Sequence, residues 1–136
     1  MENYTVTVKE SFKELSKREK VRFKSAQEKV SLSDEVKKAP VVFQPNNVVV
    51  LAIHNPHTKE RQEDGTTKRI EKDYLEIIIE TKEGVLYSTS SESFYSSLMG
   101  IMMDMDEGED TEPYEVRVFE KPSANFAGNF LTCELL

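Results

Sequence analysis

The chain has 136 residues, of which 38% are hydrophobic and 32% charged, with a formal net charge of −7 at pH 7. This length fits one domain with one hydrophobic core, so we expect a single domain over residues 1–136. The longest apolar run, Val48 to Ile53, is far shorter than the roughly 20 residues that cross a bilayer, and we expect no membrane partner and no signal peptide. The single cysteine, Cys133, excludes an internal disulfide and fits a cytoplasmic protein.

The charges are distributed unevenly along the chain. Residues 1–72 hold 15 Lys and Arg against 11 Asp and Glu, whereas residues 73–136 hold 3 against 14. A basic half beside an acidic half is compatible with nucleic-acid binding on one face. An unevenly charged, solvated surface is the simpler interpretation when charge is considered alone.

The first half of the chain predicts short strands separated by polar segments. Alternating apolar residues indicate strands at Tyr4–Val8 and Val21–Ser25, with one or two helical turns between them. Residues 33–47 contain two prolines and two asparagines and are interpreted as a connection. The near-continuous apolar run Val48–Ile53 predicts a strand that is buried on both faces.

The middle of the chain predicts a hairpin preceded by a long loop. Residues 55–69 are polar and contain the turn signal Asp64-Gly65, so we expect a loop there. Asp73–Thr81 predicts a strand with Leu75, Ile77 and Ile79 on one face. A turn at residues 82–84 then leads into a short strand at residues 85–88.

A helix is predicted after this hairpin. Thr89 and Glu92 have capping-box spacing, in which each side chain bonds a free backbone N–H of the other residue. One face of the helix that follows is apolar, and it holds Phe94, Leu98, Ile101, Met102 and Met105. An acidic exit loop at residues 104–112 ends it.

The terminal segment predicts a second hairpin, in which Tyr114–Lys121 and Gly128–Leu135 alternate around the loop Pro122–Ala127. A register that is symmetric about this loop predicts the cross-strand pairs Val118–Leu131 and Val116–Cys133 on the core face and Phe119–Phe130 on the opposite face.

The order of these elements predicts a mainly β fold. Specifically, it predicts an OB-type, five- to six-stranded antiparallel barrel with one helix between the third-strand hairpin and the C-terminal hairpin. An open α+β sheet carrying one helix would give the same one-dimensional pattern.

Catalytic and metal-binding patterns find little support, so we expect a protein that is not an enzyme and needs no cofactor. Nucleophile-elbow, phosphate-loop and dinucleotide motifs are missing. His54 and His57 are too few for a stable zinc site, which usually has four ligands. The acidic run from Asp104 to Asp110 has its glycine at the fifth position, whereas a calcium loop needs it at the sixth. A solvated helix exit, or a docking loop for a basic partner, explains that run better.

Aromatic and basic residues form the strongest functional pattern. Binding of a single nucleic-acid strand needs flat rings on which bases stack and cations along the backbone path. The candidate stacking residues are Phe119, Phe130, Phe126 and Tyr74. The candidate phosphate contacts are Lys20, Arg22, Lys24, Arg61, Lys68, Arg69, Arg117 and Lys121. Aromatic residues at such positions can also form a plain cross-strand pair or cover a second small core.

Four stretches resemble the single-stranded DNA-binding proteins of small tailed phages with protein-primed replication. These stretches are Lys20–Gln27, Gly84–Ser88, Tyr114–Phe119 and Gly128–Leu135. The resemblance covers most of residues 12–136 in element order, and it departs from the family in the longer, more charged 55–69 loop and in the acidic 104–112 loop.

This resemblance implies sequence-tolerant coating of displaced single strands during phage DNA replication, in the host cytoplasm. Single-stranded DNA is the expected partner, with replication proteins docking on the 104–112 loop and a homo-oligomer left open. The alternative is an acidic protein-interaction module, such as a phage inhibitor or DNA mimic that acts on a host enzyme. The acidic 73–136 half favours this alternative.

Overall fold

Eight strands and three helices make up the part of the chain that the computed structural model describes, which is residues 5–26, 28–106, 112–123 and 128–136, with the backbone alone at 57–60 and 69–72. In chain order the elements are β1 (Thr5–Ser11), α1 (Lys17–Ser25), β2 (Lys29–Ser31), α2 (Leu32–Lys38), β3 (Val41–Phe43), β4 (Pro45–Arg61), β5 (Thr67–Thr81), β6 (Leu86–Thr89), α3 (Glu92–Met105), β7 (Val116–Pro122) and β8 (Asn129–Leu135).

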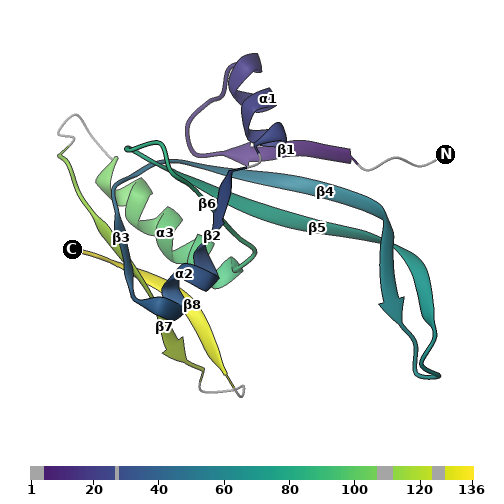
Figure 1. Cartoon of the computed structure of the whole chain (residues 1–136). Helices are drawn as coiled ribbons and strands as arrows, with labels where there is room; N and C mark the ends of the chain where they lie inside the picture. The colour runs from purple at the N-terminus through teal and green to yellow at the C-terminus, as the bar shows by residue number, and fades with distance from the viewer. Residues whose placement is uncertain (1–4, 27, 107–111, 124–127) are drawn as a thin grey trace.

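The strands form two sheets (Figure 1). A five-stranded sheet has the order β1-β4-β5-β6-β2, and a three-stranded sheet has the order β3-β7-β8. The mainly β prediction is confirmed, whereas the OB-type barrel is not confirmed, because the described strands form two open sheets. Two finer expectations are wrong: β2 pairs with β6 in parallel, and the described residues contain three helices instead of one. None of these helices is long and apolar enough to span a membrane.

β4 is the central element because both of its faces are buried. Val48 and Val50 point into one hydrophobic cluster, and Val49, Leu51 and Ile53 point into another on the opposite side of the sheet. Successive side chains of a strand alternate between faces, so an uninterrupted apolar run requires cover on both sides. The prediction of a doubly buried strand at Val48–Ile53 is confirmed.

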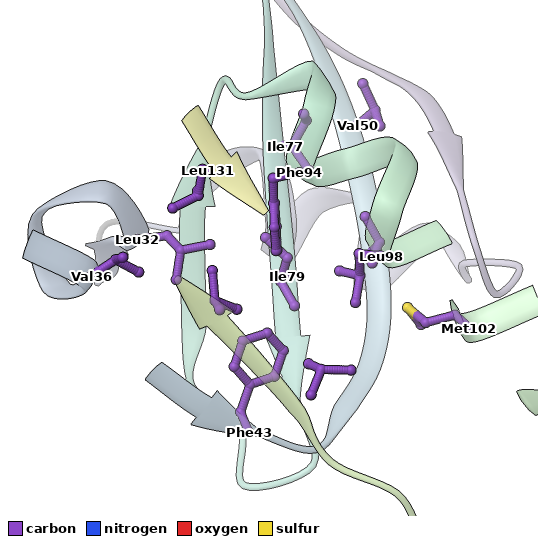
Figure 2. Close-up of a cluster of buried hydrophobic side chains, with 13 residues drawn as sticks. Leu32, Val36, Phe43, Val50, Ile77, Ile79, Phe94, Leu98, Met102 and Leu131 are labelled. Carbon is purple, nitrogen blue, oxygen red and sulfur yellow. The ribbon is translucent and has the colours of Figure 1, made fainter. Parts of the chain in front are cut away.

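The larger cluster lies between the five-stranded sheet, the three-stranded sheet and α3 (Figure 2). Phe94, Leu98 and Met102 of α3 are almost completely buried in it, at the four-residue spacing of one helix face. The helix prediction is confirmed, but its N-cap is Ser91 and not Thr89, since the Ser91 hydroxyl accepts from the backbone N–H of Phe94.

The smaller cluster lies under α1, where the predicted strand at Val21–Ser25 is wrong. Ser16 and Glu19 form a capping box, and this fixes a helix start just before the basic segment. Phe23 is fully buried while Val21 is 62% exposed, so the two apolar residues lie on different faces. Lys, Arg and Glu are good helix formers, and they outweigh the short apolar alternation.

Two predicted loops are largely regular structure. Residues 33–47 contain most of α2, which Ser31 caps, and all of β3, with Pro40 between them. Residues 55–69 mostly continue β4 and begin β5, so the two strands form a long ribbon that projects from the body (Figure 1). The turn at Asp64-Gly65 is confirmed, because Gly65 has a φ of +87° and ends that ribbon.

Candidate nucleic-acid interface

The outer surface of the β7–β8 hairpin gathers two of the predicted stacking residues. Val116 and Val118 of β7 are fully buried, so the residues that alternate with them face away from the core. Phe130 of β8 pairs with one of these outward residues and is 38% exposed. We call this surface the β7–β8 outer face, and it consists of Arg117, Phe119, Lys121 and Phe130.

Two cations lie over the ring of Phe119. The guanidinium carbon of Arg117 is 5.1 Å from the ring centroid, and the Lys121 Nζ is 5.7 Å from it. Both distances fall within the roughly 6 Å over which a cation is attracted to an aromatic face. The ring and its two cations thus combine a π-surface with positive charge in one place.

The register of the hairpin differs from the prediction by two residues. Phe119 pairs with Thr132, and Phe130 pairs with Lys121, so the predicted direct pair Phe119–Phe130 is wrong. The shift arises because β7 continues in register as far as Pro122, which pairs with Asn129. The two phenylalanines are diagonal neighbours on the same face, a relation that aromatic side chains can span. The predicted core pairs Val118–Leu131 and Val116–Cys133 are shifted likewise.

Glu134 partly neutralises the positive charge of the β7–β8 outer face. The Arg117 guanidinium donates to Glu134 Oε1 at 2.7 Å, and the two side chains are 42% and 46% exposed. Exposed pairs of this kind contribute about 0.2–1 kcal/mol, so a phosphate group could replace the carboxylate at little cost. Lys121 is exposed and forms no ion pair within the described ranges.

Val42 borders the β7–β8 outer face, although the sequence pattern did not single it out. It lies on β3, pairs with Arg117 and is 46% exposed. Residues 33–47 are interpreted from the sequence as a connection, so no strand and no outward-facing side chain is predicted at this position. It extends the apolar part of the β7–β8 outer face toward the sheet edge.

The predicted cations of α1 lie elsewhere, on the opposite side of the five-stranded sheet (Figure 1). Lys20 and Lys24 are exposed there. Arg22 has a structural partner, since its guanidinium donates to Glu80 Oε2 at 2.6 Å and lies 4.9 Å from the Phe23 ring centroid. Glu80 also accepts from the Asn46 amide at 2.9 Å. Arg22 therefore ties α1 to the sheet.

The predicted cations of the 55–69 segment lie on the projecting ribbon of β4 and β5. Arg61 and Lys68 are exposed next to its turn. The backbone of Arg69 pairs with Lys59, and its side chain lies outside the described part. These cations therefore belong to the five-stranded sheet, whereas the β7–β8 outer face belongs to the three-stranded sheet.

Tyr74 lies on β5 and is 38% exposed, so it too is separate from the terminal hairpin. It borders an open hollow of about 580 Å³ together with Leu75, Glu10 and Tyr95. The Tyr95 hydroxyl donates to Glu10 Oε1 at 2.5 Å. Burial, and to a smaller extent this hydrogen bond, raises the pKa of Tyr95 to about 12. Phe126, the fourth predicted stacking residue, lies outside the described residues.

The acidic 104–112 segment begins at the end of α3. Asp104, Asp106 and Glu112 are exposed, and residues 107–111 lie outside the described residues. In the described ranges, no group of three or more His, Cys, Asp or Glu side chains could hold a metal ion.

Comparison of the chain with protein-family models, with curated proteins and with solved structures finds no significant match.

Proposed function

We propose that this protein is a non-enzymatic binder of single-stranded DNA that coats displaced strands during phage DNA replication. The observation that supports it is the β7–β8 outer face, where the Arg117 and Lys121 cations lie over the Phe119 ring and Phe130 lies diagonally opposite. Bases would stack on the two rings while the cations contact the phosphates. Such contacts are tolerant of sequence because every base has a π-face.

An OB-type barrel is part of this proposal as a classification of the fold. A helix, α3, separates the β4–β6 strands from the β7–β8 hairpin, which is the element order of an OB barrel. Cross-strand contacts between β3 or β8 and the five-stranded sheet, measured in solution by NMR, would support the barrel. The absence of such contacts in solution would rule it out.

The binding test is fluorescence anisotropy of labelled oligo-dT at low and moderate salt, with duplex DNA as competitor. Replacing Phe119 or Phe130 by Ala should weaken binding by about 1–3 kcal/mol per lost stack, or roughly 5- to 150-fold. Lys121→Gln should reduce the slope of log K against log salt by about 0.7, the value for one phosphate contact on a single strand.

Phe119→Leu and Phe130→Leu are the matched controls. Leucine keeps most of the apolar volume but has no ring. The leucine variants should therefore fold like the parent and bind oligo-dT as weakly as the alanine variants do. Leucine and alanine variants that fold and bind at the parent affinity would show that this surface is not the binding site. Failure of the unaltered protein to bind oligo-dT even at low salt would refute the proposed function.

A second candidate function is the acidic protein-interaction module. Asp104 and Asp106 lie at the C-terminal end of α3, where the negative end of the helix dipole disfavours them and where the last turn has no basic residue. Met103, beside them, is 59% exposed. Capture of a specific host protein that persists with nuclease present, and that Asp104→Lys with Asp106→Lys abolishes, would support this candidate. Capture of nucleic acid alone would count against it.

A further inference from the structure

The exposed surface of α1 is the most basic part of the described chain. Five of its nine residues are Lys or Arg and one is acidic. Arg22 is held by Glu80. The other four are exposed, and they are Lys17, Arg18, Lys20 and Lys24. None of the four forms an ion pair where the structure is described, although the chain has 25 acidic residues against 18 basic ones.

The stability of α1 accounts for only part of this charge, since Lys and Arg are good helix formers but their positions are not all favourable. Lys17 and Arg18 occupy the first turn, where the positive end of the helix dipole disfavours cations. Lys20 and Lys24 are four residues apart, a spacing at which like charges repel. The single acidic residue, Glu19, is engaged in the capping box with Ser16 at 3.2 Å. Lys24 lies in the last turn, where the dipole favours a cation, but Lys17 and Arg18 lie where it disfavours them. Four exposed cations on one short helix, with no acidic partner among the described residues, also repel one another, which indicates a partner of opposite charge.

The apolar residues of α1 narrow the chemistry of that partner. Phe23 is fully buried under the helix, and Val21, 62% exposed, is the large apolar side chain left at its surface. A helix that lies on a membrane needs a broad apolar face for the acyl chains, and α1 has none to offer. A flexible polyanion, such as the phosphate backbone of a nucleic-acid strand, needs only the cations.

We infer that α1 is a second contact for the phosphate backbone of single-stranded nucleic acid, through Lys17, Arg18, Lys20 and Lys24. This inference rests on the proposed function and extends it. α1 covers the side of the five-stranded sheet opposite the three-stranded sheet, so the two contacts lie on different sides of the molecule (Figure 1). A short strand engages the β7–β8 outer face alone, whereas a long strand passes around the molecule and reaches α1 as well.

The test compares two triple variants that lose the same charge. One is Lys17→Gln with Lys20→Gln and Lys24→Gln on α1. The control is Lys37→Gln with Lys38→Gln and Lys82→Gln, three exposed lysines outside α1. Each variant is titrated by anisotropy against a short oligo-dT of about 8 nucleotides and a long one of about 40, since one OB-type site covers about 4–16 nucleotides.

The α1 variant should bind the long strand about 5- to 50-fold more weakly at low salt, with a salt slope about 2 smaller, because three phosphate contacts are lost. Its affinity for the short strand, and both affinities of the control, should stay at the parent values. Equal losses in both triples, an unchanged α1 triple, or equal weakening on short and long strands would overturn the inference while leaving the proposed function standing. No binding by the unaltered protein would remove both.

Discussion

The two sides of the five-stranded sheet are covered unequally. On one side α3 and the three-stranded sheet close a cluster of 13 buried residues, whereas on the other side α1 covers a cluster of six. Helix α1 contributes one fully buried side chain, Phe23, and one ion pair, Arg22–Glu80. Helix α3 is therefore integral to the fold, whereas α1 is attached to a sheet that is complete without it.

The largest expected effect comes from truncating the buried phenylalanine on each side. Phe94→Ala should lower the free energy of unfolding by about 3–5 kcal/mol, because it leaves a cavity in the larger cluster. Phe23→Ala should cost less, since α1 can detach locally and the loss cannot exceed the free energy with which α1 docks. Urea unfolding followed by circular dichroism measures both.

Amide hydrogen exchange separates the two outcomes. In Phe23→Ala the amides of α1 should exchange quickly while those of β4 and β5 stay protected. Equal losses of unfolding free energy, with the α1 amides still protected in the Phe23 variant, would show that α1 is as integral as α3.

The next effect concerns the ion pair that fastens α1. Arg22→Ala should lower the free energy of unfolding by about 1–3 kcal/mol, because it leaves the Glu80 carboxylate, whose side chain is 11% exposed, without its charged partner. Lys24→Ala, on the exposed part of the same helix, should change it by less than about 0.5 kcal/mol. Urea unfolding of both variants decides whether Arg22 is structural. If Arg22→Ala lowers the free energy of unfolding no more than Lys24→Ala does, Arg22 is not a structural residue.

The smallest effect is at the hydrogen bond that joins α3 to β1. Tyr95→Phe removes the hydroxyl bonded to Glu10 and should cost about 1 kcal/mol at neutral pH. The raised pKa of Tyr95, about 12 against a usual 10.0, means that this stabilisation is complete below pH 10 and is lost as the pH rises toward 12. The difference in unfolding free energy between parent and variant should therefore shrink over that interval. A difference that stays constant to pH 12 would contradict the assignment.

The sequence predicted elements well where a hydrophobic pattern had one interpretation. The run Val48–Ile53 is short and rich in β-branched residues, which favours a doubly buried strand. Phe94, Leu98 and Met102 recur every four residues, which favours one helix face. The segment Val21–Ser25 was ambiguous, since Lys-Val-Arg-Phe-Lys alternates like a strand and also suits a helix. The deciding signal was present in the sequence as Ser16 and Glu19, three residues apart, which form the capping box.

The candidate interface was predictable in part, for a geometric reason. Alternation assigns Phe119 and Phe130 to one face correctly, but a slip of two residues leaves every side chain on the same face, so alternation cannot fix the register. The distance between Lys20 and Phe119 depends on which sheet each element joins. That information arises from tertiary packing, and no local pattern carries it.

The parallel pair β2–β6 has a consequence for the order in which the chain can fold. Lys29–Ser31 pairs with residues 86–88, and Val41–Phe43 pairs with residues 116–118. During synthesis, β2 and β3 therefore cannot pair until β6 and β7, which are made much later, have emerged. Contacts between such distant segments close large loops, and they slow folding relative to local pairing. The β4–β5 hairpin closes a turn of five residues and needs no distant partner. We therefore expect this hairpin to form early during synthesis on the ribosome. The five-stranded sheet can be completed once β6 has emerged, whereas the three-stranded sheet is completed only after the β7–β8 hairpin has emerged.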